Sequence, residues 1–207
     1  MPSIEFVSKT SEKQNISLFN CIMGAIILDG PSFKINSLDS IIENFDDSAI
    51  SVSKSSKHKK NQIDLVAKRS NILSKSDTTL HLNTIQCSDS IFTGKISIDG
   101  KDQASNWIRY SRYENGSKLP IIEINQKIRQ VAFKCITDIP IFVSKTFGSS
   151  YYLCLDNMCS EKITAGGENS LSMGVYNKSH KLKQMEIVKT RLNEYLPFGK
   201  KLLIYKK

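Results

Sequence analysis

The sequence predicts an α+β protein: a mainly antiparallel β-sheet core, short helices near the N-terminus and a basic helix near the C-terminus. Three observations carry this prediction. Asn115-Gly116 lies between two β-prone runs and suits a tight hairpin turn. Apolar and polar residues alternate in residues 80–83 and 95–98. After Ser179, a helical apolar stripe runs through residues 182–195, followed by Pro197.

The N-terminal part combines a strand with two helix-like segments. Residues 3–9 resemble a short strand. Residues 15–28 are strongly apolar with a helical spacing, although a buried strand explains the same run. Ser37 resembles a helix N-cap, and the apolar residues that follow form one stripe. We therefore expect short helices before residue 46.

From residue 78 onward the pattern favours β-structure. Residues 107–124 predict a hairpin around Asn115-Gly116, in which Trp107 and Arg109 share one face and Ile108 and Tyr110 the other. This interpretation also predicts that Trp107 is largely buried. Residues 124–136 fit a helix or a strand, and their density of β-branched residues favours the strand. Residues 151–155 and 162–164 suggest further strands, and no internal repeat is evident.

Length and composition limit the class of protein. The 207 residues suit a single domain spanning 1–207, with a mobile basic loop at 51–62. No apolar run is long enough for a membrane span, and the N-terminus does not resemble a secretory signal. Five cysteines at loose spacings predict free thiols in a reducing compartment, the cytoplasm or nucleus of the producing or host cell.

The net charge of +9 is concentrated in two segments. Residues 1–50 are acidic overall, whereas residues 51–70 and 178–207 are strongly basic. Such segments favour a polyanion, either nucleic acid or an anionic membrane surface, although a solubilising surface explains them as well. The candidate polyanion-binding residues are Lys54, Lys57, Lys59, Lys60, Lys181, Lys183, Lys189, Arg191, Lys200 and Lys201.

Aromatic and basic residues interleave around the single tryptophan. On one face of a sheet they would form a stacking platform with phosphate contacts, as in proteins that bind single strands. The alternative is an ordinary hairpin with the tryptophan inward and the arginines outward. The members of this candidate stacking and phosphate face are Trp107, Arg109, Tyr110, Arg112 and Tyr113.

No motif indicates catalysis, a cofactor or a metal. Gly166-Gly167 lacks the lysine of a phosphate-binding loop, Cys154 and Cys159 lack a second ligand pair, and His81 would lie far from Cys87 along an extended strand. The leading hypothesis is a non-enzymatic structural or binding protein, such as a viral or other assembly component, that contacts a polyanion. The alternatives are a protein-interaction module with incidental charge and an unrecognised enzyme. The acidic N-terminal and basic C-terminal parts also suggest a head-to-tail homo-oligomer.

Overall fold

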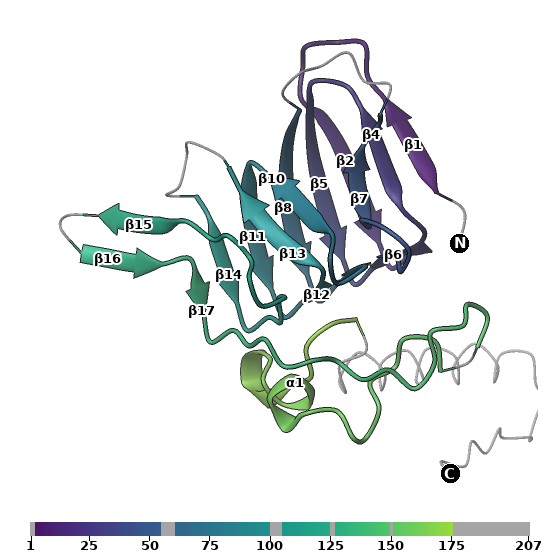
Figure 1. The fold of residues 1–207 in the computed structure, drawn as a ribbon, viewed down its shortest axis with the longest axis vertical. Helices are drawn as coiled ribbons and strands as arrows, with labels where there is room; N and C mark the ends of the chain where they lie inside the picture. Colours follow the sequence, from purple (N-terminus) through teal and green to yellow (C-terminus); the bar gives the residue numbers. More distant parts are fainter. Residues whose placement is uncertain (1–2, 55–60, 100–104, 125–126, 150, 176–207) are drawn as a thin grey trace, which may run out of the picture.

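The computed structural model describes residues 3–54, 61–99, 105–124, 127–149 and 151–175. In these residues the chain winds into a parallel β-solenoid (Figure 1). Each turn, here called a rung, places successive short strands on different sides of a shared core. Equivalent strands of successive rungs then pair in parallel.

Three groups of strands form the sides of the solenoid. The six-stranded sheet contains β2 (Gln14–Phe19), β5 (Ser32–Leu38), β8 (Gln62–Lys68), β11 (Thr84–Ser88), β14 (Trp107–Arg109) and β17 (Ala132–Phe133). The four-stranded sheet contains β3 (Ile22–Met23), β6 (Ile41–Asn44), β9 (Asn71–Ser74) and β12 (Ile91–Thr93). The third side is formed by β1 (Ile4–Val7), β4 (Ile26–Asp29) and β7 (Ile50–Val52), and by β10 (Thr79–Leu82) with β13 (Lys95–Ile98).

The predicted antiparallel core is wrong. Among the described strands, only β15 (Ile121–Ile124) and β16 (Lys127–Gln130) pair in antiparallel fashion, in a hairpin that leaves the solenoid. Alternation shows that one face of a strand is buried, but it does not show in which direction the neighbouring strand runs. The alternating segments predicted at 80–83 and 95–98 do lie in strands, at 79–82 and 95–98, yet these strands pair with each other in parallel.

The predicted N-terminal helices are also wrong. Residues 15–28 form most of β2 and β4, with β3 between them, and the segment after Ser37 forms the end of β5 and then β6. Non-glycine residues with positive φ interrupt both segments, namely Asn20 at 51° and Asp39 at 50°. A residue in the left-handed region turns the chain sharply, so a continuous helix cannot pass through it. The apolar residues at helical spacing therefore belong to short strands that are separated by a sharp turn.

The turn at Asn115-Gly116 is present, but the predicted hairpin is not. Ser117 N–H donates to the carbonyl of Glu114, and Gly116 has a φ of 82°. The strand before this turn, β14, pairs in parallel with β11 and β17 instead of with the segment that follows the turn. Residues 162–164, expected as a strand, lie in the short helix α1 (Glu161–Thr164). The predicted C-terminal helix falls outside the described residues.

The core consists of inward side chains aligned in columns by the parallel register. Ile16, Ile35, Leu65 and Ile85 are register partners across four rungs. A second column on the same sheet, nearer the corner, carries smaller side chains in its middle, at Ser37, Ala67 and Cys87. Small residues leave room there for the serine side chains of the corner.

A repeated corner joins the six-stranded sheet to the four-stranded sheet. In each rung it consists of one residue with positive φ followed by a serine or cysteine. The positive-φ residues are Asn20, Asp39, Arg69, Asp89, Tyr110 and Lys134, and their successors are Cys21, Ser40, Ser70, Ser90, Ser111 and Cys135. The described residues therefore contain six copies of this corner, contrary to the prediction of no internal repeat.

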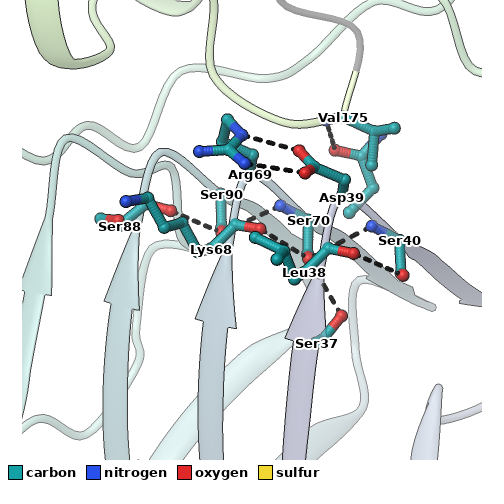
Figure 2. Close-up of polar contacts among 11 residues, drawn as sticks. Ser37, Leu38, Asp39, Ser40, Lys68, Arg69, Ser70, Ser88, Ser90 and Val175 are labelled. Atoms are coloured by element: carbon teal, nitrogen blue, oxygen red, sulfur yellow. Dashed lines mark hydrogen bonds and ion pairs between the residues drawn. The ribbon is translucent and has the colours of Figure 1, made fainter. Parts of the chain in front are cut away.

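The corner serines form a hydrogen-bonded ladder (Figure 2). The N–H of Ser70 donates to the hydroxyl of Ser90 at 3.1 Å, and the N–H of Ser90 donates to the hydroxyl of Ser111 at 3.1 Å. Each hydroxyl also donates to the carbonyl two residues earlier, as Ser90 does to Ser88 at 2.8 Å. The ladder satisfies backbone groups that a tight corner would otherwise leave buried and unpaired.

The positive-φ residues also interact across rungs. Arg69 donates two hydrogen bonds to the carboxylate of Asp39, at 2.6 and 2.7 Å, in a bidentate pair (Figure 2). The hydrogen bond to Asp39 raises the pKa of the Arg69 guanidinium, which therefore stays charged. This pair links the second and third rungs outside the serine ladder.

Residues 138–175, here called the cover, pack on the outward side of the four-stranded sheet. Outward residues Ile41, Leu73 and Ile91 form a second apolar core with residues of the cover, among them Tyr152, Leu153, Cys159, Ile163, Met173 and Val175. Polar contacts attach the cover to the corner region: Glu168 N–H donates to Asp89 Oδ1, and Val175 N–H donates to Asn71 Oδ1. Gly174 has a φ of 83°, and a Cβ there would lie 2.2 Å from Asn71 Oδ1, so this position requires glycine.

Candidate ligand-binding face

The outward side of the six-stranded sheet, here called the outer face, is the clearest candidate for a binding surface. Its side chains lie in rows because the strands are parallel and in register, about 4.8 Å apart. One row runs along Asn15, Lys34, Asp64 and Thr84; the next along Ser17, Asn36, Val66, Gln86 and Trp107; the third along Phe19, Leu38, Lys68, Ser88, Arg109 and Phe133.

Charge on the outer face is mainly positive. Lys34, Lys68 and Arg109 contribute cations, while Asp64 is the one acid in these rows. Asp64 is engaged by Lys13, whose Nζ lies 2.6 Å from Oδ2, and it accepts a hydrogen bond from Thr84. Because Lys13 offsets this acid, the described face offers an anion several cations and little repulsion.

An aromatic and basic cluster occupies the end of the outer face formed by β14 and β17. The Arg109 guanidinium lies 5.2 Å from the centroid of the Trp107 ring. Tyr110 and Phe133 meet edge to face with their centroids 6.0 Å apart, and Lys134 Nζ lies 5.5 Å from the Tyr110 ring and 5.6 Å from the Phe133 ring. Phe133 is 53% exposed. We call Trp107, Arg109, Tyr110, Phe133 and Lys134 the aromatic cluster.

The structure separates the five residues predicted to form a stacking face. Trp107 and Arg109 do share the outward face, as their alternation predicted, and Tyr110 lies at the adjacent corner. Trp107 is only partly buried and lies outside the core. Arg112 is 1% exposed and binds the carbonyls of Phe92 and Asp138, and Tyr113 packs against the core. The chain turns at Tyr110 onto another side of the solenoid, so the alternation of faces predicted from residue 107 does not continue to Arg112 and Tyr113.

Most of the predicted polyanion-binding lysines fall outside the described residues. This applies to Lys57, Lys59 and Lys60 and to every candidate from Lys181 to Lys201. Lys54 is described and exposed, two residues after the end of β7. Of the two other basic residues in segment 51–70, Lys68 lies on the outer face and Arg69 is paired with Asp39. The segment predicted as a mobile loop, 51–62, begins with two residues of β7 and ends with the first residue of β8.

The structure does not unite the candidate catalytic or metal-binding residues. His81 is exposed and lies 3.4 Å from the carboxylate of Asp99, whereas Cys87 points into the core. Cys159 is buried in the apolar core under the cover. Within the described residues, no group of three or more His, Cys, Asp and Glu side chains could hold a metal ion. In the same part of the chain, no helix combines the length and hydropathy needed to cross a membrane.

The five cysteines are free thiols, and they differ strongly in environment. Burial raises the pKa of the Cys87 thiol well above its usual value, and burial also raises the pKa of Cys135. Because the thiolate is the reactive form, we expect Cys87 to resist alkylation by iodoacetamide at pH 8 in the native state and to react fully in denaturant. Mass spectrometry of tryptic peptides measures this, and rapid native labelling of Cys87 would contradict the buried position.

Two members of the aromatic cluster, Phe133 and Lys134, were not identified from the sequence. They lie in β17 and at its corner, far along the chain from Trp107, and only the parallel register brings them beside Arg109 and Tyr110. The serine or cysteine of the corner was a signal available in the sequence. Aligning Cys135 with Ser111 would have aligned Phe133 with Arg109.

Comparisons with known proteins give no relative for this chain. No protein-family model, no curated protein and no solved structure matches it.

Proposed function

We propose that this protein is a non-enzymatic binding protein whose outer face binds a single-stranded nucleic acid. The observation that carries the proposal is the aromatic cluster, in which three aromatic rings and two cations lie together at one end of the parallel six-stranded sheet and its adjoining corner. Base rings stack on aromatic side chains, and phosphates pair with neighbouring cations, so this combination suits a flexible anionic strand.

The composition of the outer face suits an extended ligand that is bound with little preference for base sequence. Beyond the aromatic cluster, the rows supply amide and hydroxyl groups at Asn36, Gln86 and Ser88, and cations at Lys34 and Lys68. Lysines supply point charges without the bidentate geometry that reads individual bases. The basic segments 51–70 and 178–207 would add electrostatic attraction of the same kind.

The single tryptophan provides a direct test, because it lies within the proposed site. Titrating the full chain with an oligothymidylate of about 15 nucleotides should quench Trp107 fluorescence as a base stacks near the ring. If Lys68, Arg109 and Lys134 account for the phosphate contacts, the slope of log K against log salt should be about −2. Quenching with no salt dependence, or no binding at low salt, would contradict the proposal.

Matched variants locate the site. Arg109→Ala with Lys134→Ala should weaken binding roughly tenfold, because two charge-assisted contacts are lost. Lys75→Ala with Lys162→Ala removes the same charge from exposed residues away from the outer face, and should leave the affinity nearly unchanged. If both pairs weaken binding equally, attraction is general and the outer face is not the site.

A heparin titration separates nucleic acid from other polyanions. Heparin carries charge without base rings, so it should bind with a similar salt dependence but quench Trp107 little. Equal quenching by heparin would assign the face to acidic polysaccharides. If neither polymer binds, the protein-interaction module becomes the better hypothesis, and the exposed apolar residues of the cover, which include Ile139 and Met158, would be its surface.

A further inference from the structure

The first rung of the solenoid presents free strand edges. β1, β2 and β3 each lie at the end of their sheets and pair on one side only, with β4, β5 and β6. Figure 1 shows β1 at the end of the row of strands. No described residue pairs with the other edge of these three strands. A free edge carries unpaired backbone N–H and C=O groups and is a template for another strand.

Exposed apolar side chains accompany these edges. Ile4 and Val7 of β1, Phe19 of β2 and Ile22 of β3 are 43%, 61%, 60% and 44% exposed. All four belong to the first rung. Solenoid proteins normally close their ends with a polar capping unit, because an end rung otherwise exposes the apolar stack. The exposed first rung therefore has the composition of a contact surface.

The opposite end of the solenoid offers no comparable edge. β17 has only two residues, hairpin β15–β16 leaves the solenoid just before it, and the cover begins soon after it. β2, in contrast, offers six consecutive residues. Within the described residues, the edge that best matches β2 is another copy of β2. Head-to-tail stacking would have to place β2 against the much shorter β17.

We propose that the first rung is a two-fold interface with a second copy of this chain, in which two β2 strands pair in antiparallel fashion. A two-fold contact brings the β2 edge of one copy against the β2 edge of the other, so both β2 edges are paired and the pairing ends at a dimer. The segment from β1 to β2 carries Glu5, Glu12, Lys9 and Lys13, which balance in charge and create no net repulsion between copies. The two six-stranded sheets become one continuous sheet across the interface.

Sedimentation equilibrium of the full chain tests the dimer. The wild-type chain should show a monomer–dimer equilibrium that fits a single dissociation constant, without larger species. Phe19→Lys with Ile22→Lys replaces two apolar side chains of the first rung by charges that the interface would have to desolvate, and should weaken dimerisation at least about tenfold, which corresponds to 1.4 kcal/mol. Both side chains are exposed, so the fold should persist, and circular dichroism verifies this.

A control variant at the other end of the same row makes the result specific. Phe133→Lys changes a similarly exposed phenylalanine of the outer face, and the dimer should remain. A monomer at every concentration up to about 100 µM would overturn the proposal. So would equal weakening by Phe133→Lys, or growth beyond a dimer, which would indicate head-to-tail stacking.

Discussion

Replacing Arg112 by alanine is expected to lower the free energy of unfolding by about 3–5 kcal/mol. Arg112 is 1% exposed, and its guanidinium donates to the carbonyls of Phe92 and Asp138. Its Nη2 also lies 2.9 Å from the carboxylate of Glu114. Alanine would leave two carbonyls and a partly buried carboxylate without this partner, and it would open space beside the core.

Urea denaturation followed by circular dichroism measures this loss of stability, and two further variants serve as controls. Arg109→Ala removes an exposed arginine from the neighbouring strand and should change stability by no more than about 0.5 kcal/mol. Arg112→Lys retains the charge but cannot reproduce the forked donor geometry. Its loss of stability should therefore lie between those of Arg109→Ala and Arg112→Ala. A loss below about 1 kcal/mol for Arg112→Ala would contradict the structural role assigned to this residue.

Phe92→Ala should be the most damaging substitution within the apolar core, with a loss of about 3–5 kcal/mol. Phe92 is 1% exposed and points inward from β12, and its register partner Ile72 is fully buried. Removing the ring leaves a cavity that the backbone cannot move in to fill, because β12 is held by β9 on one side and by backbone hydrogen bonds with Arg112 on the other. Thermal and urea unfolding measure the loss.

The control for this prediction is a phenylalanine on the surface. Phe133→Ala removes a ring that is 53% exposed and should cost no more than about 1 kcal/mol, most of it from the edge contact with Tyr110. Similar losses for Phe92→Ala and Phe133→Ala would mean that the inward and outward sides of the rungs have been misassigned.

The sequence predicted several strands correctly but not their arrangement. Alternation in residues 80–83 and 95–98 located β10 and β13, and it placed Trp107 and Arg109 on one face. It could not reveal parallel pairing, because the corner residues with positive φ include Arg69, Tyr110 and Lys134, none of which marks a turn by its residue type. Insertions such as residues 53–61 also make the rungs unequal in length and hide the repeat.

One sequence signal for the repeat did exist. In the first five rungs, the serine or cysteine of the corner is followed by an outward residue and then an inward one, as in Ser40-Ile41-Ile42 and Ser90-Ile91-Phe92. When the rungs are aligned by this motif, Phe133 and Lys134 fall beside Arg109 and Tyr110, which adds them to the candidate site. The contacts within the aromatic cluster could not be predicted from sequence, because they depend on which rungs are adjacent.

The attachment of the cover has a consequence for the order in which the molecule assembles. Glu168 and Val175 bind Asp89 and Asn71, which belong to different rungs and are aligned only after those rungs have stacked. Each rung, in turn, templates the next through parallel pairing with its immediate neighbour. We therefore expect the cover to fold last and to open first, as a cooperative unit of lower local stability than the solenoid on which it rests.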